Sequence, residues 1–93
     1  MEIKSRFDHF NINVTDLERS IAFYEKALGL TEVRRKKGDG FTLVYLGDGG
    51  ITPHELELTF IEGRTEPYNL GENEFHLAFG VDDYEAAHAL HEE

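Results

Sequence analysis

The sequence has 93 residues, of which 40% are hydrophobic and 30% charged, with a formal net charge of −10 and no cysteine. This length and composition are typical of one soluble globular domain, and the missing cysteines exclude disulfides, thiolate metal sites and thiol nucleophiles. The acidic balance argues against nucleic acid as a partner, because phosphate binding needs a basic surface. The sequence shows neither a signal-like block nor an apolar run of the ~20 residues that a membrane span requires. It therefore predicts a cytoplasmic protein with no membrane partner that acts on or binds a small molecule.

A strand followed by a helix is predicted at the start of the chain. Residues 7–14 alternate between apolar and polar side chains, which indicates a strand with His9 on its polar face. Thr15 and Glu18 then have the spacing of a capping box at a helix start. Apolar residues at helical spacing continue to Gly29, where a left-handed residue is expected to end the helix.

Three further strands are predicted next, at residues 31–37, 41–46 and 54–61, separated by glycine-rich turns. Glu57 lies on the polar face of the last strand, because Leu56 and Leu58 occupy the other face. Together with the first strand and helix, these elements predict a complete strand–helix–strand–strand–strand unit over residues 7–61.

The rest of the chain is predicted to begin a second unit. Residues 62–74 are polar and contain glycine and proline, so they are interpreted as a linker. Residues 75–81 alternate as a strand with His76 on its polar face, and Asp82 or Asp83 is expected to cap a second helix.

The two predicted strand–helix segments have similar amino-acid sequences. HFNINVTDLE begins at His9 and HLAFGVDDYE begins at His76, and the match keeps a constant offset of 67 residues. This repeat predicts an internal duplication whose second copy, residues 75–93, is cut short. The polar faces of the strands carry His9, Glu57 and His76, and this combination of donors is suited to binding a divalent metal.

Four segments together carry a resemblance to a known family: DHFNINVTDLERSIAFYEKALGL, FTLVYL, ELELTF and YNLGENEFHLAFGV. The chain resembles glyoxalase I of the vicinal oxygen chelate superfamily. The resemblance implies an α+β fold of βαβββ modules, usually paired in a homodimer, with one complete module here plus the first strand and partial helix of a second. It also implies a metal held by His, Glu, His and Glu. By position the first three ligands are His9, Glu57 and His76, while the repeat offset puts the fourth at position 124.

The resemblance further implies lactoylglutathione lyase activity with nickel, cobalt or zinc, and Glu57 as one candidate catalytic base. Because position 124 lies beyond the printed sequence, the chain is expected to be an impaired fragment of a longer parent. Two residues depart from the pattern of relatives that use glutathione. Asn13 stands where they carry Arg, and Ile61 stands where they carry Asn. These differences leave the identity of the thiol co-substrate open.

Competing interpretations come from the same superfamily. A metal-free, drug-binding protein of the bleomycin-resistance type would use the same cavity, and an acyl-CoA epimerase would share the enolate chemistry. Epimerase relatives usually carry Gln at the position of Glu57, and a ring-cleaving dioxygenase is not expected to place a ligand there. The presence of all three candidate ligands, His9, Glu57 and His76, favours the lyase. His54 is expected to face away from the metal, and His88 and His91 are expected to lie on a solvated helix face.

Overall fold

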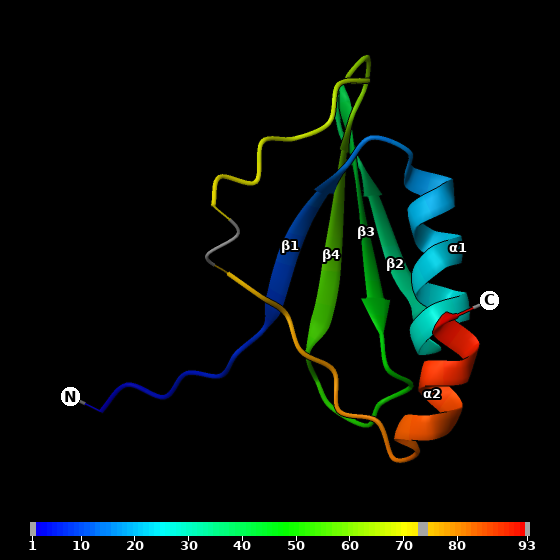
Figure 1. The fold of residues 1–93 in the computed structure, drawn as a ribbon. Helices are drawn as coiled ribbons and strands as arrows, with labels where there is room; N and C mark the ends of the chain where they lie inside the picture. The colour runs from blue at the N-terminus through cyan, green and yellow to red at the C-terminus, as the bar shows by residue number, and fades with distance from the viewer. Residues whose placement is uncertain (1, 73–74, 93) are drawn as a thin grey trace.

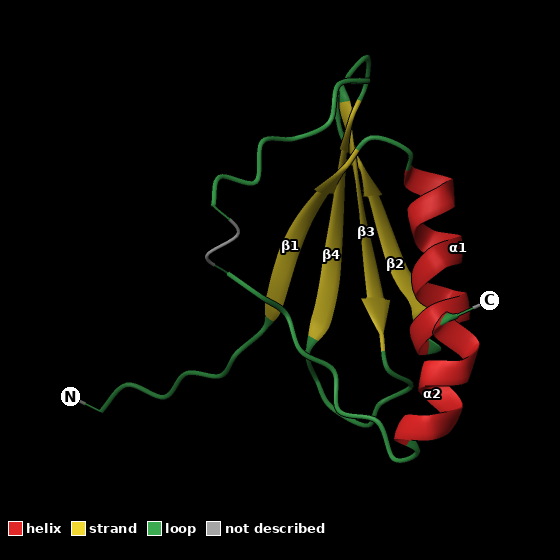
Figure 2. Cartoon of the chain, in the orientation of Figure 1, coloured by secondary structure: helices red, strands yellow, loops and turns green. Residues whose placement is uncertain are grey.

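A computed structural model of the chain describes residues 2–72 and 75–92. A four-stranded sheet forms one layer, α1 packs on one of its faces, and α2 lies beside the C-terminal end of α1 (Figures 1 and 2). In chain order the elements are β1 (His9–Val14), α1 (Leu17–Leu28), β2 (Thr31–Lys37), β3 (Phe41–Gly47), β4 (Glu55–Ile61) and α2 (Tyr84–His91). The α+β class and the complete βαβββ module are therefore confirmed. In the part of the chain that is described, the two helices are too short and too polar to cross a membrane.

The sheet has the strand order β1-β4-β3-β2, so the first and last strands of the module are neighbours. β1 runs parallel to β4, whereas β4, β3 and β2 are joined antiparallel. The parallel register places His9 opposite Glu55 and Asn11 opposite Glu57. Residues that are opposite each other in a register share a face of the sheet, so the polar side chains of β1 and β4 gather on one face.

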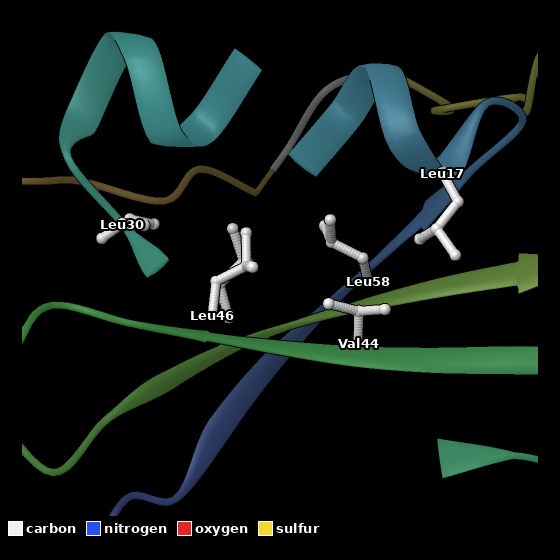
Figure 3. Close-up of a cluster of buried hydrophobic side chains, with 6 residues drawn as sticks. Leu17, Leu30, Val44, Leu46 and Leu58 are labelled. Atoms are coloured by element: carbon white, nitrogen blue, oxygen red, sulfur yellow. The ribbon is translucent and has the colours of Figure 1, made fainter. Parts of the chain in front are cut away.

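The other face of the sheet carries the hydrophobic core, which α1 covers (Figure 3). Alternation along β4 sends Leu56 and Leu58 toward α1 while Glu55 and Glu57 point to the opposite side. The buried cluster consists of Leu17, Leu30, Val44, Leu46, Leu56 and Leu58. The same period-2 pattern thus builds the core and presents the polar groups on the opposite face.

The first helix begins one residue later than the predicted capping box requires. Asp16 is the N-cap, and its Oδ1 accepts a hydrogen bond from the backbone N–H of Arg19 at 3.2 Å. The prediction that Thr15 caps the helix is wrong. Glu18 does not reach back to the helix start, because its carboxylate pairs with Arg35 at 3.2 Å.

The second helix begins with the same cap 67 residues later. Asp83 accepts a hydrogen bond from the backbone N–H of Ala86 at 3.0 Å. Its backbone angles, φ −134° and ψ 93°, nearly repeat the φ −137° and ψ 96° of Asp16. Of the two predicted caps, Asp83 is therefore the one that forms, and the offset of 67 residues is preserved in three dimensions at the helix starts.

The two equivalent caps are expected to differ in their effect on stability. Asp16→Ala should lower the free energy of unfolding by about 1 kcal/mol, because it removes an N-cap from a helix that covers the core. Asp83→Ala should leave global unfolding unchanged, since α2 has no buried residue. Urea denaturation followed by circular dichroism measures both changes. An equal loss in the two variants would show that α2 unfolds together with the sheet.

The strand predicted over residues 75–81 is not formed, and this part of the chain is extended without regular structure. In the first module the equivalent strand β1 is paired with β4, whereas no strand among the described residues pairs with residues 75–81. Residues 77–81 line an apolar cavity on the core face of the sheet, together with Phe7, Phe10 and other side chains. The predicted linker, residues 62–74, includes residues 73 and 74, which lie outside the described residues, as does the last residue of the predicted second unit.

Candidate functional site

The face of the sheet opposite α1 is lined with polar side chains, and neither helix covers it (Figure 1). The register of β1, β4 and β3 brings seven polar or aromatic residues onto this face: His9, Asn11, Asn13, Glu55, Glu57, Thr59 and Tyr45. This polar face is where two of the three predicted metal ligands meet.

His9 and Glu57 approach each other closely across the β1–β4 pair. Nε2 of His9 lies 3.7 Å from Oε2 of Glu57, and the Glu57 side chain is only 13% exposed. Two ligands that each lie about 2.1 Å from one ion are about 3.0 to 3.4 Å apart, so this pair fits a divalent metal after a small adjustment.

A carboxylate orients the imidazole of His9. Nδ1 of His9 lies 2.8 Å from Oδ2 of Asp8, so Nδ1–H donates to the Asp8 carboxylate while Nε2 is directed toward Glu57. The hydrogen bond from His9 is the main reason why the pKa of the Asp8 carboxyl lies below its ordinary value. Such a carboxylate on the outer nitrogen is the usual partner of a metal-ligating histidine, because it fixes the tautomer and the ring orientation.

Tyr45 and Arg34 lie beside this pair. The Tyr45 ring makes an edge contact with the His9 ring at a centroid distance of 5.8 Å. The guanidinium carbon of Arg34 lies 3.9 Å from the Tyr45 ring centroid, and Nη1 of Arg34 lies 2.9 Å from Oε1 of Glu55. Glu57 raises the pKa of the Tyr45 hydroxyl, first through a hydrogen bond and further through its charge, while burial acts in the same direction.

The β1 and β4 side chains of the polar face beyond Glu57 are uncharged, and the nearest cation in this row of the sheet is Lys36 on β2. Nδ2 of Asn11 donates to Oδ1 of Asn13 at 3.0 Å, and the Thr59 hydroxyl donates to Oδ1 of Asn11. Ile61 follows at the end of β4 and is largely exposed. The two positions that depart from the glutathione-binding pattern therefore contribute an amide and an apolar side chain, and no charge.

His76 does not join His9 and Glu57 within one chain. It is exposed in the irregular segment 75–81, and among residues 2–72 and 75–92 no group of three or more His, Cys, Asp or Glu could hold a metal. The expectation that one chain gathers three ligands is thus not met, because His76 would reach such a face only as part of a paired strand. The alternative expectation, that a second copy supplies His76, stays a prediction.

The remaining histidines have other contacts. Nδ1 of His54 lies 3.0 Å from the backbone carbonyl oxygen of Phe7, two residues before β1. His88 pairs with Glu92 at 2.9 Å, and Nε2 of His91 lies 2.7 Å from the carbonyl oxygen of Ala27. The two helical histidines therefore engage different partners and do not form a metal pair.

Sequence reasoning missed the residues that support the ligands, namely Asp8, Arg34 and Tyr45. For Asp8 a signal existed, since a carboxylate directly before a candidate ligand histidine is a suitable partner for its outer nitrogen. For Arg34 no such signal existed. A bulge between Glu32 and Arg34 shifts the β2 register by one residue, and this shift turns Arg34 onto the polar face opposite Tyr45.

Comparison with known families identifies the superfamily to which the chain belongs. The family model described as Glyoxalase/Bleomycin resistance protein/Dioxygenase superfamily matches residues 6–93. The chain belongs to this superfamily. The resemblance drawn from the sequence segments is therefore confirmed at the level of the superfamily and its fold.

Several relatives of this chain are named as glyoxalases. A lactoylglutathione lyase of Neisseria meningitidis is 44% identical over 85 residues, which cover 87% of this chain and 61% of the relative. A probable lactoylglutathione lyase of Vibrio parahaemolyticus is 38% identical over 81 residues, covering 84% and 58%. The structure of the trypanothione-dependent glyoxalase I of Leishmania major has a TM-score of 0.83 and 39% identity, covering 92% of this chain and 63% of its own. This glyoxalase-superfamily chain thus spans about six-tenths of the length of the relatives it matches.

Proposed function

We propose that the chain is part of a metal-dependent lyase that isomerises the hemithioacetal of methylglyoxal and a thiol to a lactoyl thioester. The observation that carries the proposal is the 3.7 Å approach of His9 Nε2 and Glu57 Oε2 on an open polar face. In this proposal His9 and Glu57 of one chain and His76 of a second copy hold nickel, cobalt or zinc. A cytoplasmic location and a small-molecule substrate, both predicted from the sequence, are kept as part of the proposal.

The reaction moves a proton from one carbon of the substrate to its neighbour, and the difficult intermediate is an enediolate. A bound divalent metal supplies Lewis-acid stabilisation of the negative charge on the two substrate oxygens. Glu57 accepts the proton from the first carbon and returns it to the second. The hydroxyl proton on the oxygen of the first carbon ends on the oxygen of the second, and the two transfers together convert the hemithioacetal into the thioester. Its low exposure limits competition from water for that proton. His9 contributes a fixed nitrogen donor, because Asp8 holds the other side of its ring.

The uncharged row of Asn11, Asn13 and Thr59 bears on the thiol. These three side chains offer amide and hydroxyl groups but no cation, so a thiol carboxylate that contacts them gains no ion pair from them. The curated relatives are named for glutathione, whereas the Leishmania enzyme is named for trypanothione. We therefore propose that this chain selects its thiol by hydrogen bonds along this row and with little dependence on thiol carboxylates.

The proposed function is tested by metal analysis and a paired assay. The purified protein is loaded separately with Ni²⁺, Co²⁺ and Zn²⁺, and thioester formation is then followed with methylglyoxal and glutathione, trypanothione or a small thiol. We expect bound metal, thioester formation at a reduced rate in keeping with the expected impairment, and loss of both in His9→Ala. Absence of metal binding together with absence of thioester for every thiol would contradict the lyase. Tight binding of a bleomycin-type drug by that metal-free protein would instead indicate the drug-binding alternative.

Assembly of the site from two copies makes a separate prediction. His9→Ala and His76→Ala chains should each bind metal poorly, yet a mixture unfolded and refolded together should recover about a quarter of the wild-type sites. This fraction follows because half of randomly formed dimers are mixed and each mixed dimer holds one intact site. Sedimentation should show a dimer. Absence of recovery, or a stable monomer at high concentration, would contradict the shared site.

A further inference from the structure

Tyr45 lies in the middle of a row of three side chains that crosses the sheet. It is the direct partner of Glu57 in the β3–β4 register and of Arg34 in the β2–β3 register. Residues directly opposite each other have Cβ atoms only about 4.5 to 5.5 Å apart, so each side chain in the row contacts the next. The β2 bulge is what completes the row, because without it Val44 would face Arg34.

The contacts in this row fix the Tyr45 ring from two sides. Arg34 stacks over the ring face with 3.9 Å between its guanidinium carbon and the ring centroid, while the His9 ring meets the ring edgewise. Nη1 of Arg34 pairs with Glu55 at 2.9 Å, which holds the guanidinium in place. A stacked cation and an orthogonal aromatic contact are each favourable for an aromatic ring, and together they restrict its rotation.

The arrangement divides the two carboxylates of β4 between different partners. Arg34 neutralises Glu55, whereas Glu57 lies opposite Tyr45 in the β3–β4 register and has the His9 ring beside it. A carboxylate has two oxygens, so Glu57 can accept a hydrogen bond from Tyr45 and still direct Oε2 toward His9. A neutral donor restrains the carboxylate without removing its negative charge, and a metal ligand needs that charge.

We propose that Tyr45, clamped by Arg34, is a positioning residue that orients the Glu57 carboxylate toward His9. This role rests on the proposed metal site. Removal of a residue that hydrogen-bonds to a metal-ligating side chain typically changes metal affinity by about 10- to 100-fold. Tyr45 would therefore set the affinity of the site without touching the ion or the substrate.

The test is a comparison of Zn²⁺ dissociation constants, measured by competition with a chromophoric chelator. Tyr45→Phe keeps the ring contacts and removes only the hydroxyl, so we expect a rise in the dissociation constant of about 10-fold or more. Tyr84→Phe is the matched control, because Tyr84 is exposed on α2 and stacks only on His88. It should bind Zn²⁺ like the wild type, and the urea midpoints of both metal-free variants should match that of the wild type.

A double-mutant cycle separates positioning from a general structural effect. In a Glu57→Gln background, Tyr45→Phe should change the residual Zn²⁺ affinity by less than about twofold, because the group that it orients has been altered. Equal effects in both backgrounds would overturn the proposal. Should Tyr45→Phe fail to fold, Arg34→Gln takes its place. It removes the clamp together with the ion pair to Glu55, and we expect a smaller rise in the dissociation constant that is likewise absent in the Glu57→Gln background.

The outcomes distinguish this proposal from the proposed function. Wild-type protein that binds none of Ni²⁺, Co²⁺ and Zn²⁺, or whose metal affinity is unchanged in His9→Ala, would overturn both. Wild-type binding that His9→Ala weakens, combined with a Tyr45→Phe value within about twofold of wild type, would overturn the positioning role alone and leave the metal site intact.

Discussion

We expect Glu57→Gln to lower kcat for thioester formation by at least about 100-fold, the lower end of what one general base contributes. Gln has nearly the same shape as Glu and keeps contact with Tyr45 and His9, but it can neither accept the substrate proton nor supply a negative ligand. The loss falls on the transition state, so kcat should fall more than KM changes. Steady-state kinetics at saturating metal measures both constants.

The control for this substitution is Glu62→Gln, which removes the same charge from the turn just after β4 and should leave kcat within about twofold. If Glu57→Gln keeps both full kcat and bound metal, Glu57 is neither the base nor an essential ligand. The lyase assignment would then rest on the similarity to named relatives alone.

Leu58→Ala should lower the free energy of unfolding by about 3 kcal/mol. Leu58 is fully buried between α1 and the centre of the sheet, and truncating a buried leucine typically costs about 2 to 5 kcal/mol through lost burial and the cavity left behind (Figure 3). A domain of this size is stable by only about 5 to 15 kcal/mol, so this single change removes a large fraction of the total. Urea denaturation with a constant m-value measures the loss.

The control is Leu70→Ala, since Leu70 is 74% exposed in the loop after β4 and should change the free energy of unfolding by less than about 0.5 kcal/mol. A loss below about 1 kcal/mol for Leu58→Ala would mean that the centre of the sheet is not the main source of stability.

The elements that depend on local pattern were predictable from the sequence. The strand at His9–Val14 and the helix at Leu17–Leu28 follow from alternation and helical spacing, and the offset of 67 residues recurs in the caps Asp16 and Asp83. The strand at 75–81 has the same alternation but does not form, because a strand also needs a partner at hydrogen-bonding distance. The alternation of apolar and polar residues shows that a segment can form a strand, but not whether another strand lies beside it.

The residues of the candidate site likewise fall into those that the sequence predicted and those that it did not. Parity along a single strand placed His9 and Glu57 on polar faces, and the parallel register then brought them within 3.7 Å. Arg34 was missed because its neighbour depends on a one-residue bulge in β2, which reverses the parity of the residues after it. Such a shift leaves no mark in the alternation of a strand that is charged along nearly its whole length. Tyr45 was missed because its neighbour Glu57 is set by the β3–β4 register, which the alternation of a single strand does not give.

The parallel pairing of β1 with β4 also sets the order in which the chain can fold. Its paired residues are 46 positions apart, from His9 to Glu55, whereas β2, β3 and β4 are joined by short hairpin connections. Closing the longer loop costs more chain entropy, so the three-stranded meander should form in the rate-limiting transition state and β1 should dock after it. Ile12→Val should then give a φ-value below that of Val44→Ala. On this route His9 reaches Glu57 only in the last step, and the proposed metal-binding pair forms at the moment when folding is complete.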